Sequence, residues 1–496
     1  MLLPSLAPAC RRLRRAARAG IAAVSLAACT AALAAAPAEV DALPPAVDAA
    51  LQRAGLPPAA LSAMLVEVAG RTPARLAYQG DKALNPASVM KLVTTFAALD
   101  LLGPAFTWET PVYLEAQPQG GRLRGNVYIQ GQGDPTLVVE RLWLLMQRLR
   151  ASGIAQIDGD IVLDRTAFRL PAHDPAEFDG EPWRPYNAGP DALLLNYKAV
   201  LMDFQPDAAA GVAHLRYLPP LAGVDLPASV PLAGPDAACG DWRGALRADF
   251  ADAARIAFEG AYPQACGARE WSVVPADPSG FAARAVAGMW REVGGQLTGR
   301  VRDGQVPAGL QPAFKIRSPA LTEVVQAINK HSNNVMTQQL LLTLGLQLGG
   351  QGSFESARTV IARWWRERMG AADLPTVDNG AGLSREARIT ARALTRMLQQ
   401  AWAAPVMPEF VASLPVWGVD GTLRRRPALA AGAAHLKTGS LRDVAAMAGY
   451  VLGASGRRYV LVAMVNHPNA AAARPALDAL IDWAARDAGL SNGRNW

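Results

Sequence analysis

Three short motifs constrain how this chain can fold, because their side chains make chemical sense only if they meet. They lie at residues 88–91 (Ser-Val-Met-Lys), 332–334 (Ser-Asn-Asn) and 437–440 (Lys-Thr-Gly-Ser). A hydroxyl three residues before a lysine lies on the same helix face as that lysine. Serine becomes a good nucleophile when a base takes its proton, and lysine can be that base only in its neutral form. We therefore expect a fold that brings the second and third motifs beside Ser88 and Lys91.

Length and charge set broad limits on what the chain can be. With 496 residues, of which 51% are hydrophobic and 18% charged, it is globular in composition and long enough for two or three domains. The formal net charge is +7, but residues 1–36 contain five arginines and no acidic residue, so the remainder carries about +2. This balance gives no argument for a nucleic-acid partner.

The N-terminal residues have the pattern of an export signal. The arginines precede an apolar run from Ile21 to Leu33 and three small residues at 34–36. The run is too short to span a bilayer comfortably, and no later segment reaches about 18 uninterrupted apolar residues. We predict a signal peptide over residues 1–36 and a periplasmic protein with no transmembrane segment after cleavage.

The cysteines bear on processing and on redox compartment. Residues 26–29 (Leu-Ala-Ala-Cys) resemble a bacterial lipoprotein box, in which Cys29 would be acylated; the alternative is cleavage near Ala36. Beyond the signal, Cys239 and Cys266 lie in glycine-containing, loop-like sequence. In an oxidising compartment such a pair is expected to form a disulfide, which would contribute ~3 kcal/mol; the alternative is two buried thiols. Neither cysteine has metal-site spacing, and we predict no metal and no cofactor.

Hydrophobic periodicity and turn residues divide the chain into helical ends and a strand-rich middle. Residues 37–48 are rich in Pro and Ala and predict a loose lead-in, and Ser318 followed by Pro319 predicts a helix start. The predicted strands lie at 60–68, 125–130, 159–163, 212–218, 445–452 and 459–465, and the predicted helices at 88–102, 138–151, 281–296, 319–330, 335–346, 354–369, 390–403 and 471–487. This order suggests an α/β fold.

Together the three motifs resemble the signature of the penicillin-recognising serine enzymes. More narrowly, the chain resembles the D-alanyl-D-alanine carboxypeptidase/endopeptidase family, the class C low-molecular-mass penicillin-binding proteins (peptidase family S13). Ser332 lies 244 positions after Ser88, a longer separation than in β-lactamases of the same superfamily. Further stretches that carry the resemblance lie at 131–137, 183–187, 239–242, 379–385, 414–416 and 418–423.

The resemblance implies a fold and a domain organisation. The fold is a penicillin-binding-protein transpeptidase-like domain, with an antiparallel sheet flanked by helices, that carries a large β-rich insertion. We expect the catalytic domain to comprise residues 37–106 and 300–496, and the inserted region of one or two subdomains to comprise residues 107–299.

The same resemblance implies an activity and catalytic residues. The protein would be a serine DD-peptidase acting on peptidoglycan stem peptides, and β-lactam antibiotics would inhibit it covalently. Ser88 would attack the carbonyl carbon and form an acyl-enzyme, Lys91 would take its proton, and Ser332 would relay a proton to the leaving amine. The oxyanion would be held by the backbone amides of Ser88 and Ser440.

The remaining site residues are expected to bind substrate. Asn334 would hold the substrate's amide and orient the base. Lys437 would bind the terminal carboxylate together with the Thr438 and Ser440 hydroxyls. Gly439 would let the substrate backbone lie close against the strand.

Two departures from the family pattern and two rival functions stay open. The middle motif is Ser-Asn-Asn, not the Ser-Asp-Asn of class A β-lactamases, and residues 379–383 read Asn-Gly-Ala-Gly-Leu where the family often has Asp-Gly-Ser-Gly-Leu. One rival is a β-lactamase, which shares the chemistry but deacylates fast. The other is a non-catalytic wall-binding protein that keeps the fold. A Ser-His-Asp triad is disfavoured because no Gly-x-Ser-x-Gly elbow occurs.

Overall fold

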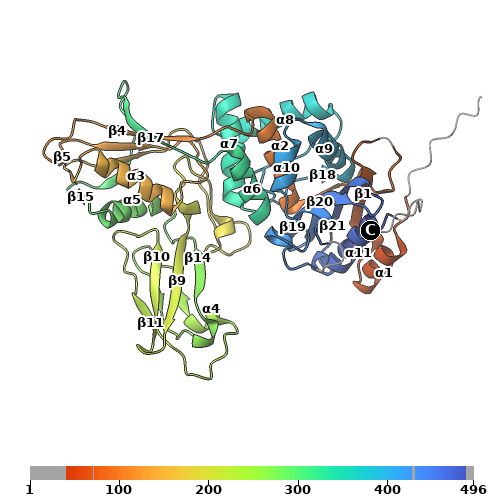
Figure 1. Cartoon of the computed structure of the whole chain (residues 1–496), viewed down its shortest axis with the longest axis horizontal. Helices are drawn as coiled ribbons and strands as arrows, with labels where there is room; N and C mark the ends of the chain where they lie inside the picture. Colours follow the sequence, from red (N-terminus) through yellow and green to blue (C-terminus); the bar gives the residue numbers. More distant parts are fainter. Residues whose placement is uncertain (1–40, 71, 427–430, 488–496) are drawn as a thin grey trace, which may run out of the picture. The chain divides into compact units, whose positions relative to one another are not determined.

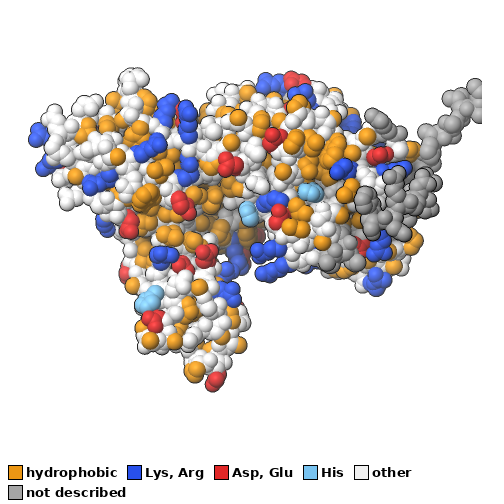
Figure 2. Space-filling view, viewed as in Figure 1, with side chains coloured by type: hydrophobic (Ala, Val, Ile, Leu, Met, Phe, Trp, Pro, Cys, Tyr) orange, Lys and Arg blue, Asp and Glu red, His pale blue; other side chains and the backbone are white. Residues whose placement is uncertain are grey.

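The structure, a computed structural model, describes residues 41–70, 72–426 and 431–487 (Figure 1). All of these belong to the second of two compact units, Glu39–Trp496. The predicted signal peptide and Cys29 lie outside the described residues. On the face drawn in Figure 2, acidic and basic side chains are interspersed over the surface. Among the described helices, none has both the length and the apolar composition needed to cross a bilayer.

A five-stranded antiparallel sheet joins the two ends of the described chain. Its order is β19-β20-β21-β1-β2. Strand β1, from the N-terminal part, pairs along its whole length with β21, from the C-terminal part. The bounds are Leu61–Glu67 (β1), Leu76–Tyr78 (β2), Ala434–Leu441 (β19), Val444–Leu452 (β20) and Arg458–Asn466 (β21).

Helices cover both faces of this sheet, so its strands contribute side chains to two hydrophobic cores, one on each face. Val462 of β21 lies in the core shared with α2 and α6–α10, whereas Leu461 and Ala463 lie in the core shared with α1 and α11. Successive strand side chains point to opposite faces, which explains why β21 is apolar at nearly every position. The bounds are Pro45–Arg53 (α1), Lys91–Leu102 (α2), Leu321–His331 (α6), Asn334–Gly349 (α7), Phe354–Met369 (α8), Ala391–Ala403 (α9), Met407–Ser413 (α10) and Arg474–Ala485 (α11).

Residues 107–299, called the middle region below, form further sheets with their own cores. One sheet has the order β16-β8-β6-β4-β17, and α3 and α5 share its core. Strands β15–β17 lie at residues 296–317 and pair with β7, β8 and β4. The division into a catalytic domain and an insertion stays a prediction. The bounds are Glu109–Leu114 (β4), Arg122–Leu123 (β5), Val127–Gln130 (β6), Gln156–Ile157 (β7), Ile161–Asp164 (β8), Gln296–Leu297 (β15), Val301–Asp303 (β16), Pro312–Arg317 (β17), Val139–Ala151 (α3) and Phe281–Glu292 (α5).

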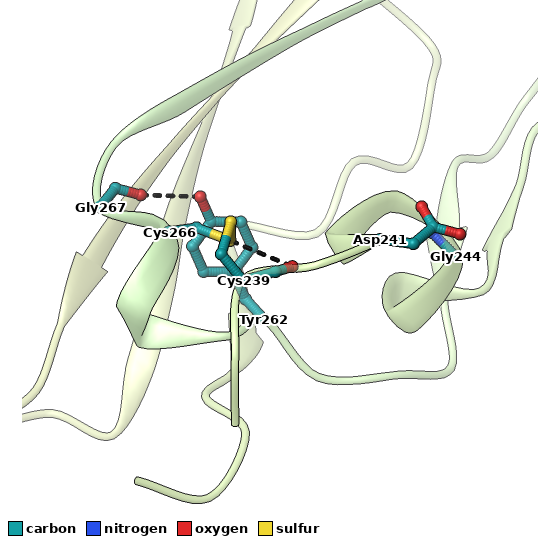
Figure 3. The surroundings of a disulfide bond; sticks show 6 residues. All are labelled: Cys239, Asp241, Gly244, Tyr262, Cys266 and Gly267. Atoms are coloured by element: carbon teal, nitrogen blue, oxygen red, sulfur yellow. Dashed lines mark hydrogen bonds between the residues drawn. A yellow bond between two sulfur atoms is a disulfide. The ribbon is translucent and has the colours of Figure 1, made fainter. Parts of the chain in front are cut away.

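A smaller four-stranded sheet, β11-β10-β9-β14, shares its hydrophobic core with the disulfide, whose cysteines lie in a loop and a 3₁₀ turn outside the strands (Figure 3). Cys239 and Cys266 are bonded to each other beside an aromatic core in which Phe204 stacks on Tyr262. The Tyr262 hydroxyl donates to the carbonyl oxygen of Gly267 at 2.7 Å. The bounds are Val200–Asp207 (β9), Val212–Leu218 (β10), Ser229–Pro231 (β11), Arg269–Val273 (β14) and Trp242–Leu246 (α4).

Two local expectations are wrong. The predicted lead-in over 37–48 overlaps helix α1, which begins at Pro45 and buries Val47, Ala50 and Leu51 against α11. This i, i+3, i+4 spacing forms an apolar helix face even in Pro- and Ala-rich sequence.

The helix predicted to begin after Ser318 begins at Leu321 instead. Ser318 Oγ accepts a hydrogen bond from the backbone N–H of Trp108 at 2.9 Å, so this hydroxyl joins two distant segments and does not cap the helix. At the start of α6, the side chain of Glu323 accepts from the backbone N–H of Ala320 at 3.2 Å.

Candidate active site

The predicted nucleophile lies in a tight turn that leads directly into α2. Ser88 is in the 3₁₀ turn Ala87–Met90, and Lys91 is the first residue of α2. Ala87 has a φ of +46°, a left-handed conformation that costs energy for a residue with a side chain. The Asn85 Oδ1 atom accepts from the Ala87 N–H at 2.9 Å and holds this turn. The strain is therefore stabilised by a buried side chain two residues earlier.

Lys91 is wholly buried among neutral hydrogen-bond acceptors. Its Nζ donates to Asn334 Oδ1 at 2.7 Å and to the carbonyl oxygen of Ala381 at 2.6 Å, and it lies 2.9 Å from Ser88 Oγ, within hydrogen-bond distance of that hydroxyl. Burial lowers the pKa of Lys91 well below its usual value, and the Lys437 cation lowers that pKa further. The arrangement favours a neutral amine in contact with the serine hydroxyl, which is what a general base requires.

The second and third motifs meet each other at the same site. Lys437 Nζ donates to Ser332 Oγ at 2.8 Å and to the carbonyl oxygen of Thr438 at 2.8 Å. Lys437 is also wholly buried, and this burial lowers its pKa to about 7. Ser332 has a φ of +59° and ends α6, and Asn333 caps α7 by accepting from a backbone N–H. The break between the two helices is what turns the Ser332 hydroxyl toward β19.

Asn334 links the base to the middle region. Its Oδ1 accepts from Lys91, and its Nδ2 donates to the carbonyl oxygen of Tyr186 at 3.0 Å. The amide donor that was expected to hold a substrate is thus occupied by the backbone of residues 185–187 in this structure. A neighbouring contact strengthens the link, because Gln339 of α7 exchanges two hydrogen bonds with the backbone of Asp191 at 2.9 and 2.8 Å.

The third motif lies within β19, an edge strand of the sheet. Thr438 is half-buried and Ser440 is exposed, so both hydroxyls are near the surface. A Cβ atom added to Gly439 would lie 2.5 Å from the carbonyl oxygen of Pro86 and 2.9 Å from the N atom of Ser88. Gly439 is therefore needed for β19 to approach the nucleophile turn, a reason that the sequence analysis did not give.

The loop at 379–383 contributes backbone rather than an acid or a hydroxyl. Asn379 donates to the carbonyl oxygen of Leu383 at 2.7 Å and accepts from the N–H of Ala381 at 3.0 Å. This folding aims the Ala381 carbonyl at Lys91. Gly382 has a φ of +73°, and a Cβ there would lie 1.8 Å from the carbonyl oxygen of Ala87. Sequence reasoning missed Ala381, for which the glycine-rich loop was the available signal.

A second missed contact fixes the segment before the nucleophile. Asn85 and Asn466 exchange hydrogen bonds, with the Asn85 N–H donating to Asn466 Oδ1 at 2.8 Å and Asn466 Nδ2 donating to the Asn85 carbonyl oxygen at 2.9 Å. The Asn85 side chain also donates to the carbonyl oxygen of Ser384 at 2.8 Å. The end of β21 thereby positions the turn that carries Ser88.

The site offers acid–base and nucleophilic groups but no ligand set for a metal. Over residues 41–70, 72–426 and 431–487, no three His, Cys, Asp or Glu side chains gather closely enough to hold a metal ion. The amine beside Ser88 is that of Lys91, as the spacing of the first motif leads one to expect. A buried lysine amine in contact with a partly exposed serine hydroxyl suits acyl transfer.

Comparison with known proteins decides the family. The profile of the D-Ala-D-Ala carboxypeptidase 3 (S13) family matches residues 43–487. The chain belongs to this family. It is 30% identical over 403 residues to a D-alanyl-D-alanine carboxypeptidase from Actinomadura sp. (strain R39), an alignment that covers 76% of this chain and 72% of that protein. It is 24% identical over 405 residues to D-alanyl-D-alanine carboxypeptidase DacB from Haemophilus influenzae, covering 78% and 82%.

The fold is also that of a solved relative. The crystal structure of penicillin binding protein 4 from Haemophilus influenzae superposes with a TM-score of 0.68 at 22% identity, covering 88% of this chain and 99% of that chain. The predicted family, the predicted penicillin-binding fold and the predicted class of enzyme, a serine-type D-Ala-D-Ala carboxypeptidase, are thus confirmed.

Proposed function

We propose that this protein is an exported DD-peptidase that acts on peptidoglycan stem peptides through an acyl-enzyme on Ser88, and that β-lactams acylate the same hydroxyl. The observation that carries the proposal is the 2.9 Å contact between Ser88 Oγ and the Nζ of the wholly buried Lys91. Supporting relatives include the carboxypeptidases named above and penicillin binding protein 4 from Haemophilus influenzae, which has been crystallised with a β-lactam.

In the acylation step, Ser88 Oγ bonds to the carbonyl carbon of the penultimate D-alanine while its proton passes to Lys91 Nζ. The carbon–nitrogen bond then breaks, and the leaving amine takes a proton from Ser332 Oγ. Lys437 Nζ, 2.8 Å from that oxygen, returns a proton to Ser332. The lowered pKa of Lys91 is what makes the first transfer feasible at neutral pH.

The negative charge that develops on the carbonyl oxygen needs fixed donors. The backbone amides of Ser88 and Ser440 are suited to this role, because the absence of a side chain at Gly439 lets β19 lie close to the N atom of Ser88. Removal of one such donor typically costs ~3 kcal/mol of transition-state stabilisation.

The terminal carboxylate of the substrate would bind beside Lys437, Thr438 and Ser440. Burial lowers the pKa of Lys437 to about 7, so this amine is only partly charged near neutral pH without a ligand. An incoming carboxylate would favour the charged form and raise that pKa again. Substrates with a free carboxylate would therefore complete the site electrostatically.

Export and domain organisation are part of the proposal. The signal-peptide pattern at 1–36 and the disulfide between Cys239 and Cys266 both suit an oxidising, periplasmic location. A catalytic domain of residues 37–106 and 300–496 would carry the chemistry, and the inserted region of residues 107–299 would supply the Tyr186 contact to Asn334. The enzyme would release terminal D-alanine, cut D-alanyl–diaminopimelate cross-links, or do both.

Labelling with a fluorescent penicillin followed by mass spectrometry tests this proposal. We expect one stable adduct, on the peptide that contains Ser88, and loss of both the adduct and D-alanine release in Ser88→Ala. A label on another residue would refute the site assignment. Rapid turnover of the penicillin would favour a β-lactamase, and D-alanine release by Ser88→Ala equal to wild type would favour a non-catalytic protein with contaminating activity.

A further inference from the structure

The segment 418–423 (Gly-Val-Asp-Gly-Thr-Leu) brings a hydroxyl to the site that the acylation chemistry does not use. Thr422 lies in the 3₁₀ turn Gly421–Leu423 and is exposed, and its Oγ1 is 3.3 Å from Oγ1 of Thr438. Thr438 lies on β19 between Lys437 and Gly439. A hydroxyl from a separate loop is therefore in hydrogen-bond contact with the third motif.

An ion pair holds this loop on one side of Thr422. Asp420 Oδ2 accepts from Lys330 Nζ at 2.6 Å, and Asp420 Oδ1 accepts from the N–H of Val416 at 2.7 Å. Lys330 Nζ also donates to the carbonyl oxygen of Leu414 at 2.6 Å, and its side chain is only 12% exposed. Because Lys330 is two residues before Ser332, the loop is tied to the helix end that carries the second motif.

The backbone and the core hold the loop more closely still. Gly421 has a φ of +54°, and a Cβ there would lie 2.7 Å from the carbonyl oxygen of Lys330, so the loop rests directly on α6. On the other side, Leu423 is wholly buried in the core shared with α1 and α11. Thr422 is thus an exposed residue between two fixed neighbours, which is how a binding side chain is held in position.

Two hydroxyls in contact leave one O–H free to donate to a ligand. If Thr422 donates to Thr438, the Thr438 proton is directed outward; if Thr438 donates, the Thr422 proton is. Lys437 Nζ already donates to two oxygens. Hydroxyl donors on this strand would therefore carry much of the recognition of an anion.

We propose that Thr422 is a specificity-determining residue, which acts with Thr438 and Ser440 to recognise the free C-terminal carboxylate of the substrate. This inference rests on the proposed function. The Asp420–Lys330 ion pair is assigned as the positioning contact that keeps the Thr422 hydroxyl within reach of Thr438.

The test compares substrates with and without a carboxylate. For wild type, Thr422→Val and Thr422→Ser, we would measure kcat/KM with a synthetic peptide ending in D-Ala-D-Ala and with its C-terminal amide. Thr422→Val should lower kcat/KM for the peptide acid about tenfold, mainly by raising KM, and should change kcat/KM for the peptide amide less than twofold. Thr422→Ser should restore kcat/KM for the peptide acid. Acylation rates with benzylpenicillin and its methyl ester give the same comparison should the amide react too slowly.

Matched variants separate recognition from folding. Thr359→Val removes an exposed hydroxyl from α8, where it donates to the carbonyl oxygen of Glu355, and should change neither substrate. Asp420→Asn keeps an acceptor for Val416 but weakens the ion pair, and should reproduce a smaller loss on the acid alone. Equal losses on acid and amide in Thr422→Val, or no loss on either, would overturn the inference.

The outcome for wild type distinguishes this inference from the proposed function. If wild-type protein neither releases D-alanine nor is acylated by penicillin, the proposed function fails. If wild type is active and Thr422→Val does not discriminate between the acid and the amide, the role of Thr422 alone is refuted.

Discussion

Cations shielded from solvent have opposite kinds of partner in two regions of this molecule: Arg165 and Lys198 are partly buried beside a carboxylate, whereas Lys91 and Lys437 are wholly buried among neutral groups. In the middle region, Asp191 Oδ2 lies 3.2 Å from a nitrogen of Arg165 and 3.0 Å from Lys198 Nζ. In the active site, the hydrogen-bond partners of Lys91 and Lys437 are hydroxyl, amide and carbonyl oxygens. A neighbouring carboxylate favours the charged form of an amine, whereas burial among neutral groups favours the uncharged form. The second arrangement gives up ionic stabilisation and gains an amine that can accept a proton.

The two regions differ in purpose as well as in chemistry. Asp191 also exchanges backbone hydrogen bonds with Gln339 of α7, the helix that begins at Asn334. Its ion pairs therefore stabilise the junction between the middle region and a helix of the active site. The described hydrogen bonds of the two site lysines go to neutral oxygens, an arrangement that suits the reaction proposed for them.

The largest expected effect comes from removing the base. Lys91→Met should lower the second-order rate constant for acylation by a fluorescent penicillin about 10³-fold, because no other neutral amine contacts Ser88 Oγ among the described hydrogen bonds. Lys91→Arg should lower the acylation rate constant as well, since a guanidinium is not deprotonated in proteins and so does not accept the serine proton. A Lys91→Met variant that is folded by circular dichroism and acylates at the wild-type rate would contradict the assignment.

A carboxylate placed beside Lys91 should make the active site resemble the middle region. Asn334→Asp puts a negative charge next to Lys91 Nζ, which raises the pKa of the amine and leaves it protonated at neutral pH. We expect kcat/KM for a D-Ala-D-Ala peptide to fall about 10²-fold at pH 7 and to recover as the pH rises. Asn334→Ala, which adds no charge, should be impaired equally across the pH range. If the acidic limb of the pH–rate profile does not shift to higher pH in Asn334→Asp, a neighbouring carboxylate does not control the protonation of Lys91, and the contrast between the two regions is refuted.

Stability should record the neutral state of Lys437. Its pKa is about 7 in the folded protein and 10.5 ordinarily, so between these values the unfolded chain binds one more proton. The contribution of Lys437 to the free energy of unfolding therefore increases as the pH rises from about 7 to 10.5. Below pH 7 the amine is charged in both states, and its burial destabilises the folded protein by the full cost of desolvating that charge. Urea midpoints at pH 6, 8 and 10 should show a smaller rise in Lys437→Met, which loses this contribution and keeps that of Lys91. Parallel pH dependences of the two proteins would argue against a depressed pKa.

The smallest effect is expected in the middle region. Lys198→Met leaves Arg165 to pair with Asp191, so we expect a loss of about 1 kcal/mol in stability and an acylation rate within twofold of wild type. Thermal unfolding and penicillin acylation, measured on one preparation, check both statements. Loss of acylation comparable to that of Lys91→Met would show that the middle region takes part in the chemistry.

Much of the fold and the location of the site were predictable from local sequence patterns. Helix geometry alone predicted that Ser88 and Lys91 would meet, because their spacing fixes their relative position. The nearly continuous apolar runs of β20 and β21 identified buried strands. The gap between the helices predicted at 319–330 and 335–346 located the turn at Ser332, although Asn334, which was placed outside both helices, is the first residue of α7.

The contacts that were missed have no local signature. Ala381 acts through its carbonyl oxygen, which every residue possesses, so the glycine-rich loop around it signals an unusual backbone but the residue type does not say which carbonyl is used. Asn85 and Asn466 are 381 positions apart, and nothing near either residue indicates the other. The strand that contains Lys437 was implied only by the family resemblance and not by hydrophobic periodicity, because polar residues interrupt its apolar alternation. Long-range packing decides these features, and a single sequence does not encode packing in a readable pattern.

The two glycine contacts at Ser88 have a consequence for drug escape. Gly382 and Gly439 lie so close to the turn that carries Ser88 that any larger residue would displace the backbone of residues 86–88. Under the proposed function, a larger side chain at either position would therefore impair the reaction of Ser88 with its natural substrate as well as with a β-lactam. Resistant variants should instead arise further from the reaction centre, where a substitution can discourage the drug without moving the serine.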